Sequence, residues 1–282
     1  MGIKIVTDSA SDISYKEAEK MGLVFLPLTV TFGDKEYKDS IDISQDEFYE
    51  KLENGPVLPK TSQVTPFQFE QAFEKIIDAG DTPIAITVAS TVSGTFSSAS
   101  IAAERFGGKA FVVDSYSGSV GERVLVNYAL SLVEKGLDAE SIVRELEAVR
   151  EKIVVLFLVD TLEYLQKGGR LSKMASVAGT LLSVKPILTF QDCKISLVGK
   201  ARGFKKGNNL LKEIAVERGE FDSEKPFVIC YSGSDRETLD KYLEKYEELF
   251  ETKLDSIPVC QIGSTIGTHV GPNAIGIGFF VK

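Results

Sequence analysis

The chain contains a single histidine, His269, within the stretch GTHVGPNAIG that runs from Gly267 to Gly276. An imidazole at this place could act as a general base, as a positive partner for a bound anion, or as a loop residue without a chemical role. A hydrolase would also need a nucleophilic hydroxyl beside His269 and a carboxylate that orients the ring. The sequence has neither a G-x-S-x-G nucleophile motif nor a G-x-x-x-x-G-K-[ST] nucleotide motif. The residue type alone leaves the three roles open.

Hydroxyl-rich loops form a second group of candidates; most follow an expected strand, and KTSQVTP precedes the helix expected at Thr65. In ASTVSGTFSS we expect the strand to end near Ala89 and a helix to begin at Gly94 or Thr95. The N–H groups of a helix N-terminus bind phosphates and carboxylates, although Ser93 could equally be a simple cap. Three similar loops are TDSASD (7–12), KTSQVTP (60–66) and DSYSGS (114–119). Ligands bind beyond the carboxyl ends of strands in open α/β sheets, so together these loops favour a binding site.

An arginine follows two glycines in DTLEYLQKGGRLSKMA, the segment from 160 to 175. The spacing of Asp160 and Glu163 predicts a helix cap, and the glycine pair allows a tight turn that presents Arg170. A single arginine of this kind is either a solvated loop charge or an anion ligand. The second role requires other anion-binding groups to converge on Arg170.

The composition limits the classes of partner. The net charge is −9, and 43% of the residues are hydrophobic. An acidic chain lacks the clustered positive surface that nucleic-acid binding needs. The three cysteines are widely spaced and suit a reducing compartment rather than a disulfide framework or a zinc site. We therefore expect a cytoplasmic protein without a leader segment, a bound metal or a cofactor.

Apolar strand-like runs alternate with helical segments over most of the chain, which predicts an α/β fold. Continuous runs at 3–6, 84–89, 110–114, 154–160 and 227–232 indicate strands buried on both faces, as in a parallel sheet. Helix starts are expected at the capping pairs Ser14–Glu17, Ser44–Glu47, Thr65–Gln68 and Ser234–Glu237.

The pattern changes near residue 152. A hairpin around the polar turn Gln191–Asp192 follows, and two more strands flank the histidine stretch. We expect an N-terminal α/β domain (1–152) with a mostly parallel sheet and flanking helices. A C-terminal α+β domain (153–282) is expected to have a mixed or antiparallel sheet.

The order of several motifs resembles that of the DegV family over essentially the whole chain. The matching motifs are TDSASD, KTSQVTP, STVSGTFSSA, DSYSGSVG, DTLEYLQKGGRLS and GTHVGPNAIGIGF. One departure is Asn273, where the family more usually has a second glycine after Gly-Pro. Asn tolerates the left-handed backbone conformation that a tight turn requires.

This resemblance implies two α/β domains with a long-chain fatty acid held between them. It further implies a fatty-acid-binding subunit of a bacterial fatty acid kinase, without catalytic residues of its own. A separate kinase subunit, similar to dihydroxyacetone kinases, would bind ATP and Mg²⁺. That subunit would phosphorylate the carboxylate to an acyl phosphate for phospholipid synthesis. Contact with a membrane surface would be transient.

The resemblance also implies roles for individual residues. Thr61, Ser62, Ser93 and Gly94 would hold the fatty-acid carboxylate. Arg170 and His269 would form the supporting polar network, and we expect the imidazole to be partly protonated near neutral pH.

The resemblance also implies that Arg202, in KARGFKKG, contacts the kinase subunit. Two alternatives remain. The first is a stand-alone hydrolase or phosphotransferase that uses His269 and Ser93, and the second is a regulatory binder of another lipid anion.

Overall fold

The computed structural model describes residues 2–171, 184–236, 239–240, 243 and 256–282. Its N-terminal part contains a four-stranded, wholly parallel sheet in the order β2-β1-β6-β7. The strands are β1 (Ile3–Asp8), β2 (Val24–Leu26), β6 (Thr82–Thr87) and β7 (Phe111–Asp114). The parallel arrangement of this sheet confirms the sequence-based expectation.

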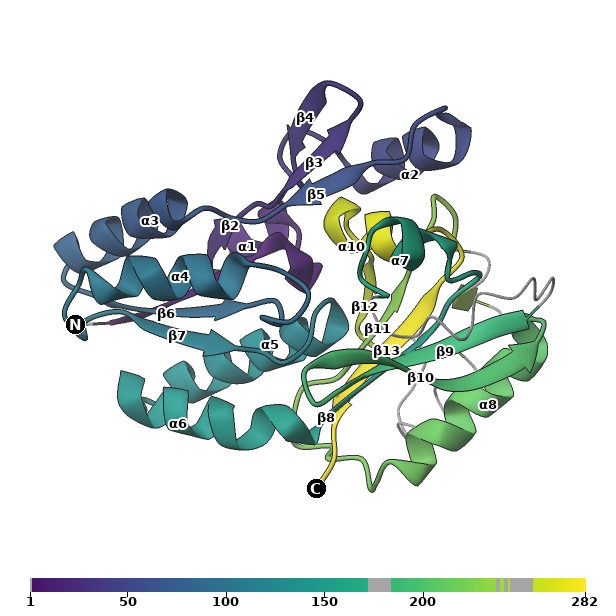
Figure 1. Ribbon diagram of the computed structural model, residues 1–282. Coiled ribbons are helices and arrows are strands. Elements are labelled where there is room, and N and C mark those ends of the chain that lie inside the picture. Colours follow the sequence, from purple (N-terminus) through teal and green to yellow (C-terminus); the bar gives the residue numbers. More distant parts are fainter. Residues whose placement is uncertain (1, 172–183, 237–238, 241–242, 244–255) are drawn as a thin grey trace.

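Helices cover both faces of the parallel sheet (Figure 1). On one face α3 (Pro66–Asp78) and α4 (Thr95–Glu104) pack on Val6 and Ala85. On the other face α5 (Val120–Glu134) and α6 (Ala139–Val149) pack on Ile5, Ile84 and Ile86. Successive strand residues point to opposite faces, so these apolar strands are buried on both sides.

Side-chain caps begin several helices where the sequence predicts them. Ser14 caps α1 (Tyr15–Met21), Ser44 caps α2 (Gln45–Asn54), and Thr65 forms a full capping box with Gln68 at α3. The fourth expected pair includes residue 237, which lies outside the described residues. Asp160 is not a helix cap, because its carboxylate pairs with Lys185 and Leu162 takes the N-cap position of α7 (Glu163–Lys167).

A small antiparallel sheet, in the order β4-β3-β5, projects from this part of the molecule (Figure 1). Its strands are β3 (Thr29–Phe32), β4 (Lys35–Lys38) and β5 (Lys60–Ser62). Val30 and Tyr37 pack on Phe48 and Leu52 of α2. This sheet places β5 next to the C-terminal part of the chain.

The C-terminal part contains a six-stranded sheet in the order β10-β9-β8-β13-β11-β12. Its strands are β8 (Ile153–Leu158), β9 (Val184–Gln191), β10 (Lys194–Arg202), β11 (Val228–Tyr231), β12 (Val259–Gln261) and β13 (Ile275–Phe280). All pairs are antiparallel except β11–β12. The mixed sheet confirms the α+β expectation.

The expectation of parallel neighbours was wrong for β8, and for β11 on its β13 side. Helix α8 (Phe204–Glu217) packs on one face of the sheet, against Leu156 and Ile187. Helix α5 packs on the other face, against Val155 and Phe157. Both faces are therefore apolar, and continuous hydrophobicity reports burial on two sides rather than strand direction.

The hairpin between β9 and β10 turns at Asp192 and Cys193, one residue later than expected. Both residues have positive φ angles, 49° and 60°, which is typical of a two-residue hairpin turn. Shorter elements complete the chain: η1 (Ser9–Ser11), η2 (Arg150–Lys152) and α10 (Ser264–Val270).

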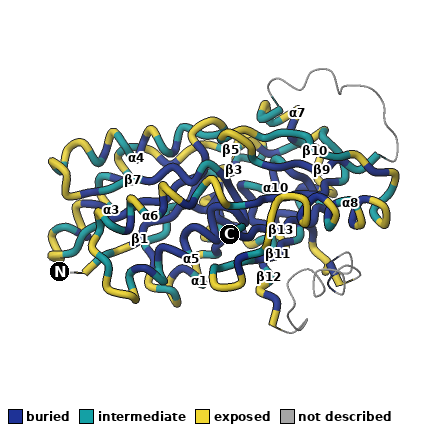
Figure 2. Tube along the Cα trace, turned by 90° about the horizontal axis from the view of Figure 1, so that it is seen from below, coloured by how far each residue is buried: buried dark blue, intermediate teal, exposed yellow. Residues whose placement is uncertain are grey.

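Strands of the two larger sheets fall on either side of residue 152, but one apolar core joins them. Helix α5 contacts β1 and β6 as well as β8, β11 and β13, so the core continues from one sheet to the other (Figures 1 and 2). The division into domains 1–152 and 153–282 stays a prediction. Among the described residues, no helix is both long enough and apolar enough to cross a bilayer.

Candidate functional site

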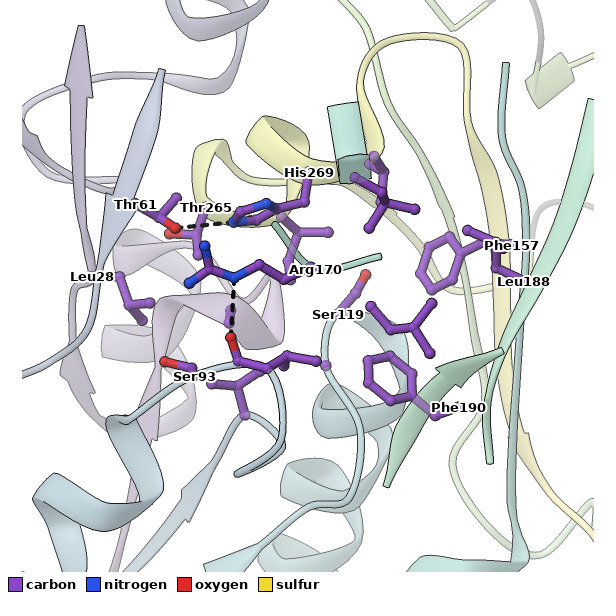
Figure 3. Close-up of a pocket in the computed structure, with 18 of the residues that line it drawn as sticks. Leu28, Thr61, Ser93, Ser119, Phe157, Arg170, Leu188, Phe190, Thr265 and His269 are labelled. Atoms are coloured by element: carbon purple, nitrogen blue, oxygen red, sulfur yellow. Dashed lines mark hydrogen bonds between the residues drawn. The ribbon is translucent and has the colours of Figure 1, made fainter. Parts of the chain in front are cut away.

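A cavity of about 400 Å³ lies where the two larger sheets and β5 meet. Figure 3 shows polar side chains gathered at one end of it and aromatic and aliphatic side chains at the other. The residues that the sequence predicts for carboxylate binding all line this cavity: Thr61, Ser62, Ser93, Gly94, Arg170 and His269. They come from β5, the loop before α4, the loop after α7, and α10.

His269 lies on a helix rather than in a loop. Helix α10 begins at Ser264 and ends at Val270, so the alternative of His269 as a loop residue is wrong. The ring Nε2 of His269 lies 2.9 Å from Thr61 Oγ1. Segments 208 residues apart are thereby joined at the polar end of the cavity.

The second ring nitrogen of His269, Nδ1, is buried and has no hydrogen-bond partner in the part of the chain that the structure describes. The backbone of Gly168 packs against it, and a Cβ there would lie 2.3 Å from Nδ1. A buried N–H without an acceptor is costly, so we assign the proton to Nε2. Nε2–H then donates to Thr61 Oγ1, which leaves the Thr61 hydroxyl hydrogen free to donate into the cavity.

His269 is neutral near pH 7, in contrast to the expected partial protonation. Burial and the neighbouring Arg170 guanidinium lower the pKa of His269 to about 4. Desolvation disfavours the charged imidazolium, and a nearby positive charge acts in the same direction. Among the described residues that line the cavity, the positive charge therefore comes from Arg170, and His269 contributes a neutral hydrogen-bond donor.

Arg170 reaches the cavity from the turn after α7. Two backbone carbonyls hold its side chain: Nε donates to Val92 O at 3.2 Å, and Nη1 donates to Gly168 O at 2.7 Å. Within the described residues, no carboxylate forms an ion pair with this guanidinium. A guanidinium has five N–H donors, so several remain for a ligand. The electrostatics of this end favour an anion.

The N-terminus of α4 forms the facing wall. Gly94 is the N-cap residue and provides no side-chain cap, while Ser93 Oγ lies 2.9 Å from Thr95 Oγ1. Gln63 bridges this helix to β5, because its Nε2 donates to Gly94 O and to Ser98 Oγ. A Cβ at Gly94 would lie 2.0 Å from Gln63 Oε1, so a larger residue there would displace the Gln63 side chain from this bridge.

The opposite end of the cavity is apolar. Its wall includes Phe157 of β8, Leu188 and Phe190 of β9, and Ile195 of β10. Leu188 and Phe157 are almost fully buried and belong to the core that joins the two sheets. The sequence analysis missed these residues, because apolar positions in a strand look alike whether they face a core or a cavity.

Buried carboxylates hold α10 in place. Asp39 accepts hydrogen bonds from Ser264 Oγ at 2.5 Å and from the N–H groups of Ser264 and Thr265 at 3.2 and 3.0 Å. Asp12 accepts from Gly263 N at 2.8 Å, and burial raises the pKa of Asp12 to about 7. Negative or polar acceptors at a helix N-terminus satisfy its free N–H groups.

The loop TDSASD supports the site rather than lining it. Only Ala10 of this loop contacts the cavity. Ser9 Oγ accepts from Leu28 N at 3.0 Å and lies 3.2 Å from Thr265 Oγ1 on α10. This loop therefore supports α10 instead of providing hydroxyls to the cavity. The signal for this role in the sequence is the pair Asp8 and Asp12, because Asp12 accepts from Gly263 N.

Two other expectations concern the kinase contact at Arg202 and a hydrolytic triad that uses His269 and Ser93. Arg202 is exposed at the end of β10 and does not line the cavity. A hydrolytic triad is not assembled: His269 bonds Thr61 rather than Ser93, and among the described residues no carboxylate accepts a hydrogen bond from Nδ1. The geometry is that of an anion-binding site with an apolar extension.

We compared the chain with known protein families, curated proteins and solved structures. The family model for DegV, described as uncharacterised proteins, matches residues 2–282. A DegV domain-containing protein of Caldanaerobacter subterraneus subsp. tengcongensis is 35% identical over 283 residues, with 99% of each chain covered.

Two solved structures are similar over their whole length. A fatty-acid-binding DegV family protein from Thermus thermophilus has a TM-score of 0.88 and 30% identity, with 100% of both chains covered. A stearic-acid-binding protein from Eubacterium ventriosum has a TM-score of 0.88 and 31% identity, with 100% of this chain and 99% of the other covered. The chain belongs to the DegV family.

Proposed function

We propose that this protein binds a long-chain fatty acid, with the carboxylate at the Arg170 end of the cavity and the acyl tail against the apolar strands. One observation carries the proposal. A guanidinium without a carboxylate partner among the described residues faces a cavity whose far wall is made of Phe and aliphatic side chains. An amphipathic anion matches both ends.

The carboxylate has enough donors at this end. The Thr61 hydroxyl, which accepts from His269 Nε2–H, can donate its own hydrogen to one oxygen. The free N–H groups of Arg170, the Ser93 hydroxyl and the N-terminus of α4 surround the rest of the head group. A buried carboxylate without such donors would cost several kcal/mol.

The tail supplies most of the affinity. Burial of about 15 methylene groups at roughly 0.8 kcal/mol each gives on the order of 12 kcal/mol before the entropy of binding is subtracted. Micromolar affinity, about −8 kcal/mol, is therefore within reach of the tail alone. The two similar structures from Thermus thermophilus and Eubacterium ventriosum, described as fatty-acid-binding proteins, support this assignment.

The second part of the proposal is that the protein presents the carboxylate to a separate kinase. Ser62 and Gln63, at the polar end of the cavity, are exposed, so the head group would lie near the surface. The kinase subunit would resemble dihydroxyacetone kinases and would bring ATP and Mg²⁺. This chain would contribute binding and positioning, and Arg202 would contact the kinase. The acyl phosphate would serve phospholipid synthesis in the cytoplasm after transient contact with the membrane.

Native mass spectrometry of freshly purified protein tests the first part. We expect a co-purified adduct at the mass of a long-chain fatty acid, exchangeable with added palmitate or oleate. A protein that is empty and also rejects both lipids would overturn the proposal. A bound lipid anion of another class would favour the regulatory alternative instead.

The second part predicts a division between binding and phosphorylation. Arg170→Ala and His269→Ala should reduce phosphorylation of the bound lipid by the kinase more than they reduce lipid binding, because the tail dominates affinity. Equal losses in both measurements would contradict presentation. If the isolated chain has hydrolase or phosphotransferase activity that Ser93→Ala abolishes, the enzymatic alternative is correct and the proposed presentation to a kinase is wrong.

A further inference from the structure

A second cavity of about 280 Å³ lies behind the apolar end of the first one. The two cavities share Thr189 and Phe190 as lining residues. The rest of the second cavity's wall is mixed, because it holds Arg150, Gln191 and Arg218 beside the apolar side chains of Ile153, Val154 and Val281. A single layer of β9 residues therefore separates the apolar end of the first cavity from a space whose wall carries charged groups.

Phe190 is the aromatic side chain in this partition. It lies near the end of β9, opposite Ile195 of β10, and Figure 3 shows its ring at the far end of the cavity from Thr61. The tip of the hairpin is tied to the loop before α4, because the Thr91 hydroxyl donates to the carbonyl oxygen of Cys193. Phe190 is therefore held from both halves of the chain.

Gly118 forms the wall that faces this ring. A Cβ at Gly118 would lie 3.8 Å from Phe190 Cζ, 3.7 Å from Ile266 Cδ1 and 3.2 Å from Val88 Cγ2. Its φ angle lies outside the left-handed region, so the backbone itself accepts alanine. The missing side chain keeps open the narrow space between Phe190, Ile266 and Val88.

The charged groups of the second cavity make it less favourable for an acyl tail than the first cavity. Arg150 stacks on the Tyr116 ring at 3.7 Å and donates to Asp114 O at 2.9 Å, while its buried Nε has no acceptor among the described residues. A methyl terminus that entered this space would cover polar groups and give them no hydrogen bonds, which is unfavourable. The apolar wall formed by β8, β9 and β10 in the first cavity thus ends at the Phe190 ring.

We propose that Phe190, opposed by Gly118, is the stop that sets the longest acyl chain this protein accepts. The inference rests on the proposed fatty-acid binding and adds the residue that determines chain-length specificity. The methyl terminus would meet the Phe190 ring, and a longer chain would have to displace this ring to reach the second cavity, where charged groups share the wall. Chains beyond the limit would no longer gain the roughly fourfold affinity that each buried methylene contributes within it, so the affinity would stop rising with chain length.

A competition experiment measures the limit directly. Delipidated protein is mixed with equimolar saturated fatty acids from C12 to C22, and native mass spectrometry gives the fraction bound for each length. We expect Phe190→Ala to move the upper limit by at least two carbons toward longer chains. Gly118→Ala, which narrows the space, should move it toward shorter chains. Phe67→Ala, an exposed residue on α3, is the control and should leave the profile unchanged.

The outcomes separate this inference from the proposed function. Length profiles of Phe190→Ala and Gly118→Ala that superimpose on that of the unaltered protein, with palmitate still bound, would overturn the role of Phe190 and leave fatty-acid binding intact. Failure of the unaltered protein to bind any fatty acid would overturn both. If Phe190→Ala does not fold, Phe190→Leu and Gly118→Ala must still shift the limit in opposite directions.

Discussion

The two ends of the cavity are built in opposite ways. The polar end joins short segments from four places in the chain, held by single hydrogen bonds such as His269–Thr61 and Arg170–Val92. One wall of the apolar end is formed by neighbouring residues on three paired strands, β8, β9 and β10. The comparison indicates that affinity depends on a continuous sheet wall, whereas recognition of the head group depends on how distant loops are placed.

The largest expected effect comes from shortening the ligand at the apolar end. Replacing palmitate by octanoate removes eight methylene groups, so the affinity should fall by at least about 10⁴-fold. Isothermal titration or displacement of a fluorescent fatty acid measures this loss. A loss below about 100-fold would mean that the head group carries the affinity, which would reverse the comparison.

The next effect comes from removing the charge at the polar end. Arg170→Met keeps much of the side-chain volume and should weaken palmitate binding by roughly 10- to 100-fold, the range for hydrogen bonds to a charged group. The matched ligand is 1-hexadecanol, which has the same tail without a charge and should lose little. Equal losses for both ligands would show that Arg170 acts by packing rather than by pairing with the carboxylate.

A third effect concerns the support of α10. Asp39→Ala leaves the N–H groups of Ser264 and Thr265 without their acceptor, so the free energy of unfolding should fall by about 2–3 kcal/mol. Urea denaturation followed by circular dichroism measures the change. The control is Asp34→Ala in the exposed β3–β4 turn, where we expect less than about 0.5 kcal/mol. Equal changes in the free energy of unfolding of both variants would show that Asp39 does not stabilise α10.

The smallest effect is the titration of the single histidine. Because the pKa of His269 is lowered to about 4 from 6.5, the folded state favours the neutral ring. This preference stabilises the fold above pH 6.5, and the stabilisation is lost as the pH falls toward 4. The imidazole NMR signals should show a neutral, Nε2-protonated ring at pH 6 and 7, while urea-unfolded protein should titrate near 6.5. A titration midpoint near 6.5 in the folded protein would show that the His269 imidazole is partly protonated near neutral pH.

The sequence could predict the secondary structure and the polar end because both leave local signals. Strand runs, capping pairs such as Thr65–Gln68, and hydroxyl loops after strands can each be read from a few neighbouring residues. Thr61, Ser93 and Arg170 stood in such local patterns, and all of them line the cavity. Their roles in binding a carboxylate stay a prediction, which the experiments above test.

The sequence by itself determined the longer buried strands, the helix starts at Ser14, Ser44 and Thr65, and which side chains could meet an anion, since these depend on periodicity and side-chain type. Only the tertiary structure decided that His269 is neutral, because its pKa depends on burial and on Arg170, which lies about a hundred positions away in the chain. Tertiary packing also decided that Asp39 holds α10 and that Phe190 faces a cavity rather than a filled core. Burial, electrostatic coupling and empty space arise between distant segments, so no local pattern in the chain can specify them.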